Sequence, residues 1–309
     1  MNLSKLFILA MLPLAFFSCQ DDDDIVDFIN GEEPTDVSGL TYAENEDDSL
    51  ESIYDDVRDD IAAAGPITII AEVDHAANAA TVDQTLRPTR VLMFGNPRLG
   101  TPLMQQNMLA GLDLPQKILF YQASDDDVIV AYNSTEYLAS RFNLTDNGEL
   151  TTIGNALMGF VENNTGESVR NSNVVRVDEN RGIVQVTSTD SVDVVYDRLR
   201  AAVVDNANLG IAAELDHAAN AASVNLPLPA SKLIVFGNPA VGTPFMLEDQ
   251  SVGIDLPVKI LVFDNGNGTT IAYNDPAWLA DRHDIDDDLP AIGMMSTALS
   301  NLAAVASGN

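Results

Sequence analysis

The pattern of hydrophobic and polar positions in the first half of the chain predicts short strands alternating with helices. Residues 48–65 have apolar side chains at helical spacing, acidic residues near the start and a terminal glycine, which is typical of an amphipathic helix. Residues 66–74 and 90–94 are short apolar runs that predict strands. Between them, the small side chains of residues 75–80 (HAANAA) predict a short helix that lies close to a sheet.

The pattern continues with a hairpin and two more helices. Residues 117–123 and 128–132 predict two strands joined through the acidic turn 124–127. Further helices are expected through Arg141 and around residues 150–160. Strands and helices in mixed order, with at least one hairpin, predict an α+β fold in which helices cover a mostly antiparallel sheet.

Nearly all of this pattern occurs twice. The segment AEVDHAANAA at 71–80 returns as AELDHAANAA at 213–222, and the same offset repeats the motifs FGNP, GTP and DLP. The motif AYN returns one residue earlier than that offset requires. We therefore predict two similar domains, copy one at 39–161 and copy two at 182–309, joined by a polar linker at 162–181. Each copy is long enough to hold its own hydrophobic core.

The repeated motifs resemble a family known only as domain of unknown function 302. The resemblance is carried by EVDHAANAA (ELDHAANAA in copy two) and by FGNP, GTP, DLP followed by a lysine, and AYN, which lie in both copies. The resemblance implies a small α+β domain that associates in pairs, and it implies no established activity. We therefore expect the two copies to pair with each other inside one chain as an intramolecular pseudo-dimer.

The charge balance narrows the range of partners. The chain of 309 residues has 15 Lys and Arg against 47 Asp and Glu, a formal net charge of −32. Because such a surface cannot displace counterions from phosphates, nucleic acid is excluded as a partner. The acidic, self-repelling surface favours a monomeric chain. No glycine-rich phosphate loop, nucleophile elbow or Ser/Cys triad is present, so no cofactor is expected.

The N-terminus predicts a lipoprotein. Residues 1–18 have a basic start and an apolar run too short to span a bilayer, which is typical of a secretory signal peptide. Ser18 before Cys19 resembles a bacterial lipoprotein cleavage site, which implies a lipid on Cys19 that inserts into the membrane. Residues 19–38 predict an acidic tether that resembles the export tag of surface lipoproteins of Bacteroidota. We expect an outer-membrane protein of the cell envelope, with exposure at the cell surface left open; the alternative is an uncleaved signal anchor.

Histidine and lysine are rare in the chain, yet they recur at equivalent positions in both copies. Strand alternation places two carboxylates on one face directly before the histidine, an arrangement that can support proton transfer. The repeated FGNP asparagine, lysine and AYN tyrosine are further polar candidates. The candidate ligand site therefore comprises Glu72, Asp74, His75, Asn96, Lys117, Tyr132, Glu214, Asp216, His217, Asn238, Lys259 and Tyr273.

Each candidate also has a purely structural interpretation. Asp74 is placed to cap the helix that begins at His75, and Asn96 fits a tight turn. Lys117 fits a strand edge, where it deters pairing, or a position beside a carboxylate. The tyrosines fit packing positions with one hydroxyl bond. Thr101, followed by proline, is expected to be the N-cap of the next helix.

No metal site is expected. One histidine and two carboxylates in each copy are too few for a closed zinc site, although a site shared across the pseudo-dimer, with His75, His217, Glu72 and Glu214, is an alternative. Whether the acidic runs near residues 125 and 286 bind calcium is left open, because they lack EF-hand spacing.

Two functional hypotheses follow. The preferred one is an envelope-anchored, non-catalytic module that binds a small molecule or a protein. The alternative is an enzyme in which the repeated histidine is the acid–base group, the preceding aspartate orients it and the repeated lysine binds an anionic part of the substrate. A third interpretation treats the repeated motif as the seam between the copies.

Overall fold

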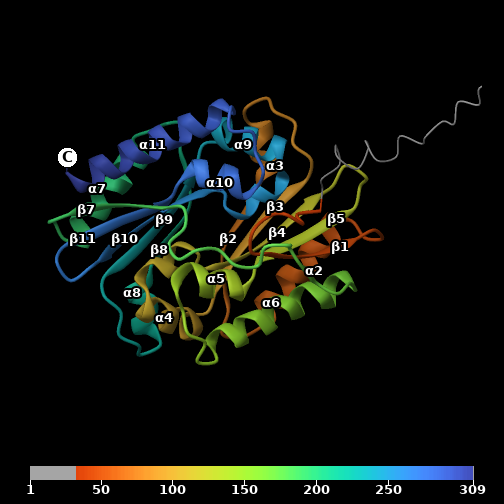
Figure 1. The fold of residues 1–309 in the computed structure, drawn as a ribbon, viewed down its shortest axis with the longest axis horizontal. Helices are drawn as coiled ribbons and strands as arrows, with labels where there is room; N and C mark the ends of the chain where they lie inside the picture. The colour runs from red at the N-terminus through yellow and green to blue at the C-terminus, as the bar shows by residue number, and fades with distance from the viewer. Residues whose placement is uncertain (1–32, 309) are drawn as a thin grey trace, which may run out of the picture. The chain divides into compact units, whose positions relative to one another are not determined.

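The computed structural model describes residues 33–308. The expected signal peptide, the lipidated Cys19 and the first part of the tether lie outside the described residues. Each copy forms one antiparallel sheet with helices against it, which confirms the predicted α+β class (Figure 1).

Copy one contains a sheet in the order β2-β3-β4-β5-β1, to which a short sixth strand is added beside β1. Its elements are β1 (Leu40–Asn45), α2 (Leu50–Ala63), β2 (Thr68–Asp74), α3 (His75–Ala80), β3 (Thr89–Gly95), α4 (Pro97–Gln106), the 3-10 helix η1 (Met108–Leu112), β4 (Gln116–Gln122), β5 (Val128–Asn133), α5 (Thr135–Phe142), α6 (Glu149–Thr165) and β6 (Arg170–Asn171). The hairpin β4–β5 and the helices through Arg141 and residues 150–160 confirm the predicted elements.

Copy two repeats this arrangement with a sheet in the order β7-β11-β10-β9-β8. Its elements are β7 (Ile183–Ser188), α7 (Val192–Val204), β8 (Gly210–Asp216), α8 (His217–Ser223), β9 (Ser231–Gly237), α9 (Pro239–Glu248), the 3-10 helix η2 (Gln250–Ile254), β10 (Val258–Asp264), β11 (Thr269–Asn274), α10 (Pro276–Arg282) and α11 (Pro290–Ser307). The repeat in the sequence is therefore a repeat of the fold.

The helix after the FGNP motif begins earlier than expected. Asn96 is the N-cap of α4, accepting a hydrogen bond from the Arg98 amide at 3.0 Å, and Pro97 takes the first helical position. The prediction of Thr101 as the N-cap is wrong, because an asparagine followed by proline is already a complete start signal. In copy two Asn238 caps α9 in the same way.

The central strands of each sheet are buried on both faces, and the second face is covered by the other copy. In β4, Ile118 and Phe120 pack in the cluster under α2, where the Phe120 ring lies 5.1 Å from that of Tyr54. Leu119 on the opposite face packs in a cluster with Ile254, which belongs to η2 of copy two. Burial on both faces explains why these strands have continuous apolar runs instead of alternation.

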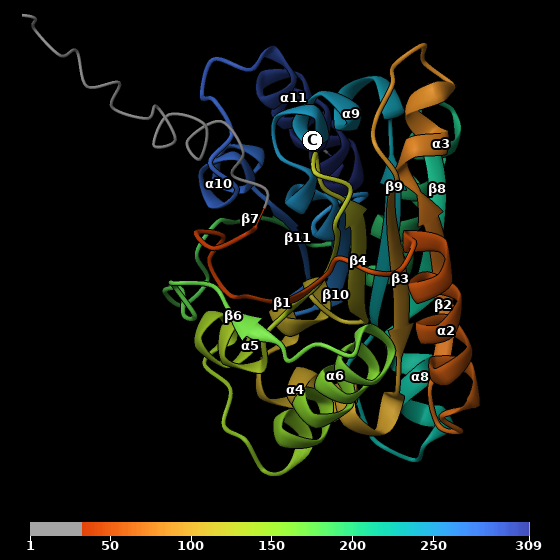
Figure 2. The ribbon, with the colours of Figure 1, turned by 90° about the vertical axis from the view of Figure 1, so that its right-hand side faces the viewer.

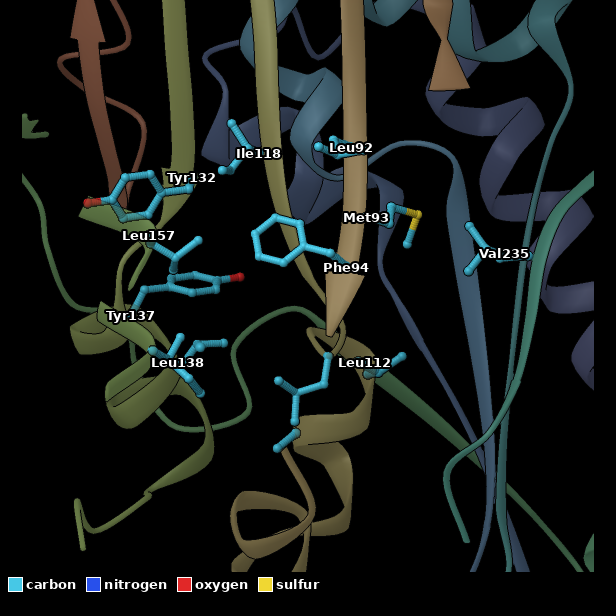
Figure 3. Packing of buried hydrophobic residues seen from close by; sticks show 14 of the residues in the cluster. Leu92, Met93, Phe94, Leu112, Ile118, Tyr132, Tyr137, Leu138, Leu157 and Val235 are labelled. Carbon is cyan, nitrogen blue, oxygen red and sulfur yellow. The ribbon is translucent and has the colours of Figure 1, made fainter. Parts of the chain in front are cut away.

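The two copies form the predicted intramolecular pseudo-dimer. The edge strands β2 and β8 lie side by side (Figure 2). Val235 of copy two belongs to the same hydrophobic cluster as Leu92 and Phe94 of copy one (Figure 3). Each 3-10 helix lies on the sheet of the opposite copy: a Cβ added at Gly253 would meet Leu119 at 2.8 Å, and one at Gly111 would meet Leu261 at 3.1 Å. The copies therefore share one continuous core.

Candidate functional site

The repeated histidines begin the short helices at the ends of β2 and β8. Asp74 is the N-cap of α3 and accepts a hydrogen bond from the Ala77 amide at 2.7 Å. Asp216 caps α8 in the same way, at 2.8 Å from the Ala219 amide. Both aspartates therefore have the structural role that satisfies the free amides of a helix start.

Both histidine rings point into the opposite copy. His75 is 4% exposed and bonds to the backbone of Gly253 in η2 and of Leu256, which follows η2. His217 is 8% exposed and bonds to the backbone of Gly111 in η1. The decapeptide that occurs twice in the sequence thus builds the same contact twice, once from each copy. The backbone contact of each histidine therefore supports the interpretation of the repeated motif as the seam between the copies.

The other ring nitrogen is uncommitted. Burial lowers the pKa of both histidines to about 4, although the backbone hydrogen bond and the preceding aspartate favour the charged ring. Both rings are therefore neutral near pH 7. Bonding to the backbone favours the protonated form, so a ring N–H group donates to the backbone. The donor is Nδ1, because Nε2 has no hydrogen-bond partner among residues 33–308. Nε2 is then the unprotonated acceptor.

Each histidine lines a cavity whose other walls come from the opposite copy. His217 lines a cavity of about 200 Å³ together with the ends of β3 and β4 and with α4 and α6 of copy one. His75 lines an equivalent cavity of about 560 Å³ against the ends of β9 and β10 and against α9 and α11 of copy two. We refer to them as the smaller and the larger cavity.

The two cavities contain further polar groups that lack a partner within the described part of the chain. In the smaller cavity this is the side-chain nitrogen of Gln116, and in the larger it is the hydroxyl of Thr243. Both side chains are more than nine-tenths buried. Because buried polar groups in folded proteins are almost always hydrogen-bonded, unpartnered atoms in residues that line a cavity are candidates for contact with a ligand.

The FGNP asparagines lie in the cavities but not beside the histidine of their own copy. Asn96 shares the smaller cavity with His217, and Asn238 shares the larger one with His75. Their side-chain oxygens are occupied by the helix caps described above. The asparagines therefore form part of the cavity walls, and only their side-chain NH₂ groups are left to contact a ligand.

Glu72 and Glu214 bind arginine and tyrosine of their own copy. Glu72 accepts bonds from the Tyr54 hydroxyl at 2.7 Å and from Arg58 Nε at 3.1 Å. Partial burial opposes ionisation, but these two bonds lower the pKa of Glu72 below its ordinary value. Glu214 accepts equivalent bonds from Tyr196 and Arg200, and Arg200 contributes most to its lowered pKa. These carboxylates join the first helix of each copy to its edge strand.

The repeated lysines lie inside the seam. Lys117 is in β4, between β3 and β5, so the strand-edge interpretation is wrong. Its Nζ donates to the Ile254 carbonyl of the opposite copy. Burial and the neighbouring Lys259 hold the pKa of Lys117 well below its usual range. Lys259 reaches Asp113 of copy one at 3.3 Å, which agrees with the carboxylate alternative.

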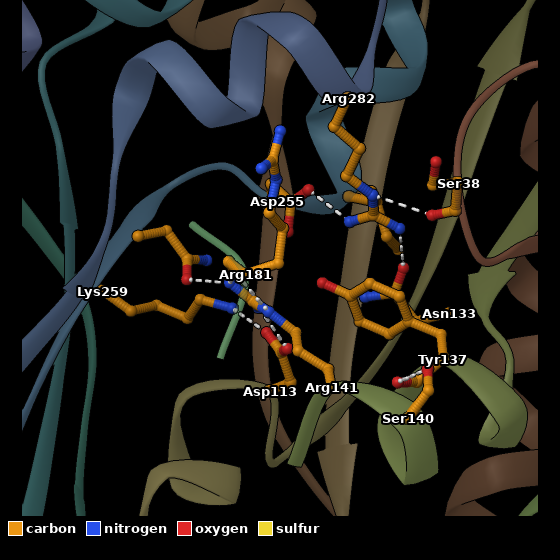
Figure 4. Close-up of polar contacts among 12 residues, drawn as sticks. Ser38, Asp113, Asn133, Tyr137, Ser140, Arg141, Arg181, Asp255, Lys259 and Arg282 are labelled. Carbon is orange, nitrogen blue, oxygen red and sulfur yellow. Dashed lines mark hydrogen bonds and ion pairs between the residues drawn. The ribbon is translucent and has the colours of Figure 1, made fainter. Parts of the chain in front are cut away.

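A buried network that the sequence interpretation missed includes Lys259 (Figure 4). Arg141 donates to Asp113 at 2.6 Å, to Asn274 of the opposite copy at 2.8 Å and to the Arg181 carbonyl at 3.0 Å. Burial alone would raise the pKa of Asp113, but Arg141 and Lys259 hold it below its ordinary value. The network fixes the position of one copy against the other.

The equivalent arginine of copy two makes the same kinds of contact, with an aspartate of its own copy and an asparagine of copy one. Arg282 donates to Asp255 at 2.6 Å, to Asn133 of copy one at 2.6 Å and to the Ser38 carbonyl at 3.0 Å. The third histidine, His283, contacts Asp255 at 3.1 Å and Ser251 at 2.7 Å. The signal for this network was in the sequence, because its charged and amide residues belong to the repeated DLP, AYN and arginine positions.

These positions separate the candidate residues into two groups. The lysines, Tyr132 and Tyr273 lie in the seam or the core, each no more than 5% exposed, and none of them lines the two cavities. The histidines line the cavities with Nε2 uncommitted. Within residues 33–308 no group of three His, Cys, Asp or Glu side chains is placed to hold a metal ion. In the same range no helix has the length and apolarity needed to cross a membrane.

The fold and these sites define a duplicated α+β protein whose two copies share one core and enclose paired cavities. The family model described as "Domain of unknown function DUF302" matches residues 42–163 and again 184–304. The chain therefore belongs to this family and contains two tandem DUF302 domains.

Similar proteins cover only part of this chain. "Fluoride-specific ion channel FluC 1" of Brucella suis biovar 1 and "Fluoride-specific ion channel FluC 2" of Brucella melitensis biotype 1 are each 37% identical over 131 residues, which is 41% of this chain. The match covers 51% and 48% of those proteins, so the chain spans about half the length of the curated relatives it matches. The crystal structure of an uncharacterized conserved protein DUF302 from Bacillus stearothermophilus is similar, with a TM-score of 0.37 and 16% identity, covering 41% of this chain and 98% of that one.

Proposed function

We propose that the protein is a non-catalytic binding module of the cell envelope, in which each cavity between the copies holds a small molecule against a histidine. The observation that carries the proposal is the Nε2 atom of His75, which is buried, unprotonated and without a hydrogen-bond partner among the described residues, in a side chain that lines a cavity of about 560 Å³. A ligand that donates a hydrogen bond to this atom removes the cost of leaving it unsatisfied.

Binding is favoured over catalysis by the separation of the histidine from the lysine. An acid–base enzyme of the kind considered above needs both groups to converge on one substrate. Here the Lys117 ammonium group contacts a backbone carbonyl in the seam, and Lys259 contacts Asp113. The aspartate before the histidine caps a helix and is not bonded to the ring.

The binding proposal is tested with the full chain by a thermal-shift screen of small neutral molecules. We expect hits that raise the melting temperature of the wild type and lose at least half of that shift in the His75→Asn/His217→Asn double variant. Asparagine keeps a side-chain N–H at the position of Nδ1 and removes Nε2, so the seam bond survives. Hits with equal shifts in both proteins, or a screen without any hit, would count against the proposal.

The envelope location rests on the N-terminal sequence. A lipid on Cys19 would hold the binding domain at the outer membrane, and the acidic tether would keep it away from the bilayer. In cells that express the full chain and are fed a radiolabelled fatty acid, we expect label in the wild-type protein and none in Cys19→Ser. The wild type should fractionate with membranes and the variant should not. An unlabelled wild type would overturn the lipid anchor and leave the binding proposal intact.

A further inference from the structure

The two cavities have the same origin but different sizes, and the difference has an identifiable cause. Strands β2 and β8 both carry an irregularity, between Ile69 and Ala71 in copy one and between Ile211 and Ala213 in copy two. A bulge of this kind turns the extra residue out of the regular alternation. That residue is Ile70 in copy one and Ala212 in copy two, and each lines the cavity of its copy.

Two more pairs of wall residues differ in the same direction. The smaller cavity has Thr68 and Leu99 where the larger cavity has Gly210 and Val241. Every one of these differences adds side-chain atoms to the smaller cavity. Together with Ile70 they narrow the smaller cavity, which has a volume of about 200 Å³ against about 560 Å³ for the larger one.

The polar groups differ as well. The smaller cavity pairs the acceptor nitrogen of His217 with the donor nitrogen of Gln116. At the position equivalent to Gln116 the larger cavity has Val258, so its unpartnered polar groups among the described residues are His75 and the hydroxyl of Thr243. Beside the Asn238 amide group, the larger cavity therefore offers one acceptor and one hydroxyl within walls that include Phe236, Met246, Leu256, Met295 and Leu299.

The chemistry of the larger cavity selects a neutral ligand. Glu72 and Asp74 lie in its wall, but the first is bonded to Tyr54 and Arg58 and the second caps α3. An ammonium ligand would thus find no free carboxylate there, and an anion would meet a neutral imidazole. A hydroxyl group can donate to the histidine without carrying charge into an apolar site.

We propose, building on the binding function above, that the larger cavity binds a largely apolar alcohol or phenol whose hydroxyl donates to His75 Nε2, and that Ile70 excludes the same ligand from the smaller cavity. The two cavities have therefore diverged. The larger one binds this class of ligand, and the smaller one is narrower and combines the donor of Gln116 with the acceptor of His217.

The test uses 1-naphthol as the probe and 1-methoxynaphthalene as its matched control, because the ether has the same rings and no donor. Binding to the full chain is measured by isothermal titration calorimetry at pH 7.5. We expect one naphthol per chain and about tenfold weaker binding of the ether. His75→Asn should weaken naphthol binding by about the same factor and leave the ether unchanged. His217→Asn, the matched variant in the smaller cavity, should change neither.

Two size variants test the selection between the cavities. Ala212→Ile should abolish naphthol binding by filling the larger cavity, and Ile70→Ala should raise the stoichiometry from one to two. Circular dichroism and thermal unfolding confirm that each variant folds. Equal binding of the ether and naphthol, or two naphthols on the wild type, would overturn this inference while the binding proposal stands. If naphthol fails to bind but the thermal-shift screen yields a histidine-dependent ligand of another class, the inference alone falls; if neither binds, both fall.

Discussion

Replacing Arg141 with methionine is expected to lower the free energy of unfolding by about 3–5 kcal/mol. The Arg141 side chain is fully buried and holds Asp113, Asn274 and the Arg181 carbonyl, so it joins the two copies at one point. Methionine fills much of the space but leaves the Asp113 carboxylate with Lys259 as its remaining cationic contact, at 3.3 Å. Removing one partner of a buried pair is costly because the other charge stays desolvated.

Urea unfolding of the full chain, followed by circular dichroism, measures this loss. Arg58→Met is the matched control, since it breaks an ion pair with Glu72 that is solvent-exposed and is expected to change stability little. Arg282→Met should behave like Arg141→Met because it has the equivalent contacts from copy two. If Arg141→Met were no less stable than Arg58→Met, the network would have no role in holding the copies together.

The fold could be predicted because each element is identified by the hydrophobic pattern of a short segment, and because the second copy repeats that pattern. Helical spacing in residues 48–65 and the apolar runs of the strands each identify an element, and the second copy repeats the order. The exception, the start of α4, came from weighing Thr101 above Asn96 although both are capable caps. Side-chain type alone does not decide which of two nearby residues, each able to cap a helix, begins it.

The candidate site could be predicted only in part, because a repeat does not say which copy a side chain faces. His75 and Asn96 lie close in sequence and were grouped together, yet each shares its cavity with the partner residue from the opposite copy. Likewise the contact between Arg141 and Asn274 joins residues 133 positions apart. Pairing across the seam exchanges partners between copies, and this exchange leaves no mark in a single sequence.

The same exchange explains why the decapeptide has changed so little between the copies. Its histidine must bond to the backbone of the opposite 3-10 helix through one nitrogen and present the other to a cavity, and its aspartate must cap the helix that carries the ring. Three separate requirements thus fall on two adjacent residues. Positions such as 70 and 212, which only line a cavity, have been free to diverge.

Lowering the pH from 6.5 to 4 is expected to remove about 5 kcal/mol from the free energy of unfolding through His75 and His217 together. Each ring has a pKa of about 4 when folded against an ordinary value of 6.5. Above pH 6.5 the rings are neutral in both states and have no effect. Between pH 6.5 and 4 the unfolded chain takes up protons that the folded chain does not, so stability falls by about 2.5 kcal/mol for each ring. Below pH 4 both states are protonated and this loss is complete.

Urea unfolding at intervals of half a pH unit measures the slope, and the His75→Asn/His217→Asn variant is its control. The variant should lose the part of the slope that comes from the two rings and keep the parts that come from His283, whose pKa burial also lowers, and from the carboxylates. Asp113 and Asp255 have pKa values lowered from 3.8, and Glu72 and Glu214 have pKa values lowered from 4.5, so these carboxylates add to the slope at the acid end of the window in the wild type and in the variant alike. An unchanged slope in the variant would mean that the rings are charged or solvated in the folded protein. In that case Nε2 would not be the bare acceptor on which the binding proposal depends.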